Sequence, residues 1–167
     1  EFSEVFKVEK PKHFVKDCLI ESDMEILLPS EYVDSSTGRI SLYNELDNIQ
    51  TEEKLQQFTE RLIDRFGPVP RQANDLLNAI RLRWIGRDLG FEKIVLRNKT
   101  LIAYFVSDQQ SAYYQTDRFT KILKYLQANP KSCRIKETND KLMIYLAGIN
   151  SVHSAINILQ QLTDFAA

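Results

Sequence analysis

The run Leu-Ile-Asp-Arg-Phe-Gly-Pro-Val-Pro at residues 62–70 constrains the fold of this 167-residue chain more than any other segment. Gly67 is suited to capping the end of a helix, and Pro70 to starting the next one, so the run predicts a tight corner between two helices. Asp64 would then lie in the last turn of the first helix, where the helix dipole disfavours an acid by a few tenths of a kcal/mol. We therefore expect a partner, inside or outside the chain, to compensate Asp64.

Hydrophobic spacing predicts three helices around this corner. The first covers about residues 37–49. The second follows Thr51, which is a good N-cap, and ends at Phe66. The third begins at Pro70 and ends at Gly90, which we expect to adopt a left-handed C-cap conformation.

The chain before these helices is predicted to have two parts. Residues 1–21 mix charges and scattered aromatics without a sustained period, which predicts a tail or a linker from an upstream domain. Residues 23–28 alternate apolar and polar side chains, which predicts a half-buried strand. Because the sequence begins with Glu1 and its first methionine is Met24, we expect a fragment of a longer chain.

The second half of the sequence has the pattern of a sheet. Residues 92–97 and 100–106 predict a hairpin, and a helix follows. Its expected apolar face is Ala112, Thr116, Phe119, Leu123 and Leu126. Strands at 132–136 and 141–147, and a helix opened by Ser151, repeat the arrangement.

Two strand–strand–helix units predict an antiparallel sheet of about four strands with helices on one face. The predicted fold class is α+β. One domain at residues 22–167 would combine a helical part (22–90) with a sheet-and-helix part (91–167).

Composition and charge limit the classes of function. With 43% hydrophobic and 27% charged residues, the chain has the composition of a soluble globular protein. Its net charge of −1 lacks the basic excess of a dedicated DNA-binding domain, and no apolar run reaches the roughly 20 residues that span a membrane. Cys18 and Cys133 are far apart, which favours two buried thiols of a cytosolic protein over a disulfide.

Motifs for catalysis or metal binding are not found in the sequence. The five glycines do not form a phosphate-binding loop, and His13 and His153 are isolated. A His–Cys dyad with Cys18 or Cys133 stays open, but a surface histidine and a core cysteine are favoured. We therefore expect no catalytic, metal-binding or cofactor-binding residue in this fragment.

Nucleic-acid binding also stays open as an alternative. The side chains that could serve it are Arg71, Arg81, Arg83, Arg87, Tyr113 and Tyr114. Asp75 and Asp88 interrupt the arginines, which point around the helix instead of along one stripe, and this favours a solvated helix face.

Several segments match a known family in order. They are residues 25–29 with Tyr32, residues 39–43, residues 62–70, residues 74–77, residues 81–83 and the pair Leu89-Gly90. With them, the stretch from about Met24 to Leu162 resembles the C-terminal domain of the bacterial transcription-repair coupling factor. The run at residues 64–70 is the most specific part.

The resemblance implies a regulatory role. The parent protein would be a cytoplasmic, bacterial, DNA-translocating ATPase that uses ATP and Mg²⁺, displaces stalled RNA polymerase and recruits the excision-repair damage sensor. In this family the C-terminal domain packs on an N-terminal module similar to the repair helicase subunit. It thereby masks the site for the damage-recognition ATPase. The alternative is a nucleic-acid-binding accessory domain of a DNA translocase.

The resemblance also implies the contact residues. Acidic positions in the helix before the corner face arginines of the partner module, and Asp64 matches one of them. The family often has Glu at the position of Arg61, and the usual Ile-Pro-Asp loop is replaced by Val-Asp-Ser at residues 33–35. We expect Asp64, with Arg61 and Arg65 beside it, to form the interdomain contact. Arg61 can also pair with Asp64 within the helix, and the sequence leaves open which of the two partners Asp64 prefers. Phe66, Gly67, Pro68 and Pro70 would be the structural scaffold of the turn.

Overall fold

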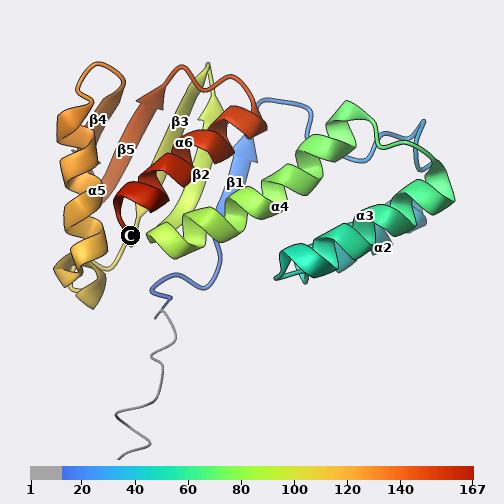
Figure 1. Cartoon of the computed structure of the whole chain (residues 1–167), viewed down its shortest axis with the longest axis horizontal. Coiled ribbons are helices and arrows are strands. Elements are labelled where there is room, and N and C mark those ends of the chain that lie inside the picture. The colour runs from blue at the N-terminus through green and yellow to red at the C-terminus, as the bar shows by residue number, and fades with distance from the viewer. Residues whose placement is uncertain (1–12) are drawn as a thin grey trace, which may run out of the picture.

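The computed structural model describes residues 13–167. In chain order its elements are β1 (Leu19–Ser22), α2 (Ser36–Asp47), α3 (Glu52–Phe66), α4 (Arg71–Leu89), β2 (Phe91–Arg97), β3 (Thr100–Phe105), the 3₁₀ turn η1 (Ala112–Gln115), α5 (Asp117–Ala128), β4 (Cys133–Thr138), β5 (Lys141–Ala147) and α6 (Val152–Phe165). Figure 1 shows the α2–α3 pair at one end, the sheet at the other, and the long helix α4 joining them. The predicted α+β class is confirmed.

The sheet has five strands in the order β1-β2-β3-β5-β4. β2, β3, β5 and β4 are antiparallel, as predicted, whereas β1 pairs in parallel with β2. Both hairpins turn through two residues with positive φ, Asn98 and Lys99 (54° and 57°) and then Asn139 and Asp140 (51° and 62°). Asn98, Asn139 and Asp140 are of the types that tolerate this left-handed conformation, and the two-residue turns fix the register of each hairpin.

The predicted strand at residues 23–28 is wrong. The strand is β1, which lies just before it in a segment expected to be a linker. Residues 23–28 instead cross from the sheet to the helices, where the Leu27 N–H donates to the Gln72 carbonyl (3.3 Å) and the Leu28 N–H to the Tyr43 hydroxyl (2.8 Å). The apolar side chains that alternate along this segment pack against the helices. Alternating burial of this kind does not require the segment to pair with another strand. The first 12 residues of the predicted linker lie outside the described residues.

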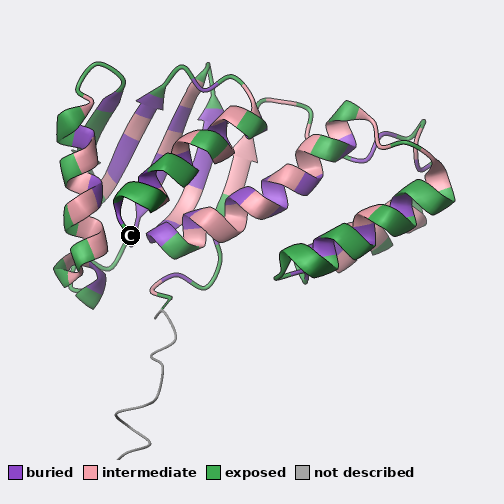
Figure 2. Ribbon diagram, viewed as in Figure 1, coloured by how far each residue is buried: buried purple, intermediate pink, exposed green. Residues whose placement is uncertain are grey.

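Two hydrophobic clusters form the interior (Figure 2). The larger lies between the sheet and helices α4, α5 and α6. The smaller joins α2, α3 and the first half of α4, and its buried members are Leu46, Ile49, Leu55, Phe58, Leu62, Leu77 and Ile80. α4 contributes Leu77 and Ile80 to the small cluster and Leu82 and Leu89 to the large one, so this helix couples the two parts.

Capping residues set the helix boundaries. The Thr51 hydroxyl accepts from the Lys54 N–H, and Ser151 forms a capping box with Ser154, as their types predict. Gly90 ends α4 in the left-handed conformation (φ 93°, ψ 24°). The predicted helix after the first hairpin is divided, because Thr116 caps a new helix after η1.

The apolar face expected for α5 is also partly wrong. Ile122 and Leu126 are its buried residues, whereas Phe119 and Leu123 are only partly buried. Among residues 13–167, no helix combines the length and apolar character needed to cross a membrane.

Candidate interdomain contact site

The corner between α3 and α4 is held by its own backbone and by one tyrosine. Gly67 has φ 90° and ψ −168°, and its N–H donates to the Ile63 carbonyl (2.9 Å). The Tyr32 hydroxyl donates to the Gly67 carbonyl (2.8 Å), and the Tyr32 ring contacts that of Phe66, with centroids 5.7 Å apart. Pro70 was expected to be the first helical residue of α4, but it is the N-cap, and the helix begins one residue later at Arg71. This corner fixes the direction of the last turn of α3.

A groove of about 540 Å³ lies between α2, α3 and the loop before α2. Its polar and charged lining includes Asp34, Glu45, Arg61, Asp64 and Arg65, and its floor includes Leu42, Phe58 and Leu62. The three residues predicted to form the contact therefore lie together on one groove.

The pair between Arg61 and Asp64, which the sequence left open, does not form in the structure. Nη2 of Arg61 forms an ion pair with Oε2 of Glu45 on α2, and its guanidinium lies 5.6 Å from the centre of the Phe58 ring. An arginine placed before an acid in the helix has the less favourable order for an intrahelical pair, and Glu45 offers a partner across the groove. Arg61 therefore links α2 to α3.

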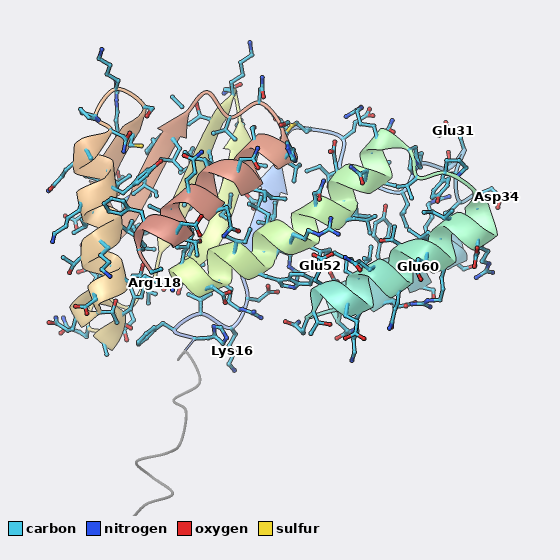
Figure 3. All side chains as sticks on the ribbon, in the orientation of Figure 1. Lys16, Glu31, Asp34, Glu52, Glu60 and Arg118 are labelled. Atoms are coloured by element: carbon cyan, nitrogen blue, oxygen red, sulfur yellow. The ribbon has the colours of Figure 1, made fainter. Side chains whose placement is uncertain are left out.

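Asp64 is exposed, and within residues 13–167 its carboxylate has no hydrogen bond or ion pair. Arg65, also exposed, lies 5.3 Å from the centre of the Phe66 ring and likewise lacks a carboxylate partner in this part of the chain. Asp34, at the same groove, is a second exposed acid without an ion pair among the described residues. Figure 3 shows Asp34 and Glu31 near the corner end of α3. The unfavourable acid in the last turn is thus left uncompensated by the described residues.

The other end of α3 is tied to α4 by a bidentate ion pair. Arg81 donates from Nε and Nη2 to the two carboxylate oxygens of Glu52, at 2.7 Å each. The hydrogen bonds from Arg81 lower the pKa of the Glu52 carboxyl, and Glu52 in turn raises the pKa of Arg81. This ion pair therefore holds the first turn of α3 on α4, at the end of α3 that does not line the groove.

The residues considered for nucleic-acid binding make internal contacts. Arg71 pairs with Asp75 (3.3 Å), and Arg83 pairs with Asp17 (2.6 Å) and Asp47 (3.1 Å). The remaining members also have partners: Arg81 with Glu52, Arg87 with Gln50 and Asp88, Tyr113 with the Leu89 carbonyl, and Tyr114 with the Val106 carbonyl. The structure therefore does not assemble these side chains into one binding surface.

No hydrogen bond joins a histidine to a cysteine among residues 13–167. Cys18 and Cys133 are buried free thiols, as predicted, and burial raises the pKa of Cys18 to about 12. His13 lies 3.3 Å from Asp88, and His153 is exposed on α6. In the described part of the chain, no group of three or more His, Cys, Asp or Glu residues is arranged to hold a metal ion.

Sequence reasoning missed two contributors to the site, Glu45 and Tyr32. Glu45 carries no local signal, because its partner Arg61 lies 16 residues away on another helix. Tyr32 belongs to the segments that carry the family resemblance, but its bond to Gly67 depends on how the loop packs on the corner.

Known proteins were compared with this chain by sequence and by fold. Residues 22–116 match the family model of the TRCF domain. The transcription-repair-coupling factor of Rickettsia bellii (strain RML369-C) is 25% identical over 142 residues, or 84% of this chain and 12% of that protein. That of Escherichia coli (strain K12) is 30% identical over 121 residues, or 65% of this chain and 10% of that protein. The chain thus spans about a tenth of the length of these curated relatives.

A crystal structure of the C-terminal domain of transcription-repair coupling factor has the same fold. Its TM-score is 0.68 at 16% identity, covering 90% of this chain and 94% of that one. The family resemblance read from the residues is confirmed by these matches. Because the family model covers more than half of the sequence, the chain belongs to the TRCF domain family.

Proposed function

We propose that this chain is a non-catalytic, autoinhibitory interaction domain of a bacterial, cytoplasmic transcription-repair coupling ATPase. The groove between α2 and α3 docks on the N-terminal module of the same parent chain and masks its site for the damage-recognition ATPase. ATP and Mg²⁺ binding, contact with RNA polymerase and translocation along DNA belong to other parts of the parent. The observation that carries the proposal is the exposed Asp64, which has no ion-pair partner within residues 13–167.

The charges at the groove favour a basic partner. Glu45 is neutralised by Arg61, so the acids left to bind a partner at the groove are Asp34 and Asp64. An arginine from another module would compensate Asp64 against the helix dipole and form a bidentate contact. The partner therefore supplies what the last turn of α3 lacks.

The contact is suited to opening. A groove with charged rims and a small apolar floor forms a modest interface, whereas a large apolar interface would not release. Contacts of this kind are weak between separate molecules. Within one parent chain, the linker supplies an effective concentration that makes them sufficient. Membership of the TRCF family supports this proposal, because the relatives are about ten times as long as this chain and a parent protein of that length has further modules to supply the partner.

The test is Asp64→Arg in the full-length parent protein, with binding of the damage-recognition ATPase measured in solution. We expect tighter binding than in the wild type, because the masking contact is weakened. The matched control is Glu60→Arg, since Glu60 is exposed on the same helix about one turn earlier and does not line the groove. Asp64→Arg also removes an unfavourable acid from the last turn, so the domain stays folded.

Two outcomes would overturn the proposal. Binding of the damage-recognition ATPase would be unchanged by Asp64→Arg, or Glu60→Arg would raise it equally. A second measurement uses the separate N-terminal module and the 167-residue chain. Asp64→Arg should weaken that complex, and reversal of an arginine in the module should restore it.

A further inference from the structure

We propose that the sheet face opposite the helices binds single-stranded nucleic acid. This surface, here called the open sheet face, is formed by Lys93, Arg97, Tyr104, Arg134, Lys136 and Tyr145. It lies on β2, β3, β5 and β4 and is separate from the α2–α3 groove. The proposal does not depend on the autoinhibitory role.

Strand register places these residues on one face. Ile94, Ala103 and Ile144 are paired across three strands, are fully buried and point into the core beneath the helices. Side chains alternate along a strand, so their sequence neighbours point to the other face. One row there is Lys93, Tyr104, Met143 and Lys136, and the next is Val95, Ile102, Tyr145 and Arg134. In Figure 1, helices α4, α5 and α6 lie on the core side of the sheet, and in the described part of the chain no helix covers the other side.

The open sheet face is strongly basic although the whole chain has a net charge of −1. Lys93 pairs with Glu21 of β1 (3.2 Å). A second acid, Glu92, lies at the bulge just before Lys93 and accepts a hydrogen bond from the Ser107 hydroxyl (3.2 Å). Arg97, Arg134 and Lys136 are exposed and have no ion pair within residues 13–167. Charges on an edge strand such as β4 serve to block aggregation. Lys93 and Arg97, however, lie on the interior strand β2, where blocking an edge requires no cation.

Each tyrosine of the open sheet face has a lysine over its ring. Nζ of Lys93 lies 5.4 Å from the centre of the Tyr104 ring, and Nζ of Lys136 lies 5.9 Å from that of Tyr145. Tyr145 is paired with Ile102, two residues before Tyr104, so the two tyrosines are diagonal neighbours on adjacent strands. Both rings are partly exposed, and neither hydroxyl has a hydrogen bond among the described residues.

This combination fits a nucleic-acid strand better than an acidic protein. Aromatic side chains on neighbouring strands of a sheet are platforms on which unpaired bases stack, and adjacent lysines and arginines bind the phosphates. A duplex keeps its bases stacked on one another and would use the cations alone. An acidic protein would likewise leave the tyrosine rings unused.

The test measures fluorescence anisotropy of a labelled oligothymidylate of about 12 nucleotides mixed with the 167-residue chain. We expect saturable binding whose affinity falls with salt, with a log–log slope of about −2 to −3 for three to four phosphate contacts. Tyr145→Leu should weaken binding about five-fold or more, and Tyr145→Phe, which keeps the ring, should not. The double variant Arg134→Gln/Lys136→Gln should weaken it as well. The charge control is Lys124→Gln, because Lys124 is exposed on α5 and lies outside this face.

The competing results are distinct. A lack of binding at low salt, or equal loss in the Lys124→Gln control, overturns the proposal. Equal affinity for a duplex of the same length would show that stacking of bases on the tyrosines does not contribute, and this also overturns the proposal. Polyglutamate that binds as tightly, and does so equally well to Tyr145→Leu, assigns the face to an acidic protein instead. If Tyr145→Leu does not fold, Tyr104→Leu and Tyr104→Phe repeat the comparison on the neighbouring strand.

Discussion

The hydroxyl of Tyr32 donates a 2.8 Å hydrogen bond to the carbonyl of Gly67 and so ties the loop before α2 to the corner after α3. The same ring packs against Phe66. This pair fixes the loop and the last turn of α3 relative to each other, and these segments form the sides of the groove that holds Asp64.

Tyr32→Phe keeps the ring contact and removes the hydrogen bond. We expect the free energy of unfolding in urea to fall by about 1 kcal/mol, the usual net value of one partly buried hydrogen bond. Tyr104→Phe is the matched control, because the Tyr104 hydroxyl has no hydrogen bond among residues 13–167. Equal losses in the two variants would show that the bond to Gly67 contributes nothing.

Two glycines with positive φ separate backbone strain from packing. An added Cβ at Gly67 has no atom within 4 Å, so Gly67→Ala carries only the strain of φ 90°, about 1–3 kcal/mol. An added Cβ at Gly90 would lie 2.2 Å from Cε1 of Tyr113, whose ring is buried and whose hydroxyl is bonded to the Leu89 carbonyl (2.6 Å). Gly90→Ala should therefore cost at least about 3 kcal/mol by thermal or urea unfolding. A larger loss in Gly67→Ala than in Gly90→Ala would contradict this account.

Local signals in the sequence were sufficient for most elements. The Thr51 side chain caps the start of α3, and Gly90 ends α4 because glycine adopts a positive φ easily. Asn98 and Lys99 mark the turn of a hairpin. Each of these signals acts within a few residues of its own position. β1 could not be found in this way. It is four residues long and is held by parallel pairing to β2, more than seventy residues later, so the stabilising partner is absent from the local pattern.

At the candidate site, too, the local features could be predicted from the sequence and the long-range contacts could not. The exposed position of Asp64 in the last turn of α3 follows from the glycine that ends the helix. The partner of Arg61 could not be predicted in this way. Glu45 lies on α2, and it contacts Arg61 only because α2 packs on α3. The open sheet face is similar: alternation predicts which way Lys93 points, but the pairing that brings Tyr104 and Lys136 into its row is a long-range register.

Glu52 and Glu53 provide a matched pair for the contact between α3 and α4. Both are acids in the first turn of α3, but Glu52 alone of the two bonds to Arg81. Glu52→Gln and Glu53→Gln lose the same favourable interaction with the helix dipole, so the difference in their unfolding free energies isolates the ion pair. We expect Glu52→Gln to be the less stable by about 0.5–1 kcal/mol at neutral pH.

Acid should remove that difference. The pKa of Glu52 is lowered in the folded state, so its contribution is complete above the unfolded pKa and is lost as the pH falls through the folded pKa. The urea-unfolding difference between the two variants should therefore shrink in acid. A difference that is absent at neutral pH, or that grows in acid, would refute the assignment.

Cys18 gives the alkaline counterpart. Burial, reinforced by Asp17 and opposed by Arg83, raises the pKa of the folded thiol from 9.0 to about 12. Between these values the thiol of the unfolded chain loses its proton and that of the folded chain keeps it. The contribution of the Cys18 thiol to the free energy of unfolding is therefore complete below pH 9.0 and falls as the pH rises through this range. The loss is at most about 1.4 kcal/mol per pH unit for one proton.

Cys18→Ala should be less stable than the wild type at neutral pH, because it leaves a small cavity beside Gly86 and Ile94. The gap should narrow above pH 9.0, since the variant has no thiol to titrate and other groups, including the buried Tyr113, cancel in the comparison. Urea unfolding of both proteins across this range tests the assignment, and a gap that stays constant would mean that the Cys18 thiol ionises equally easily in the folded and unfolded states.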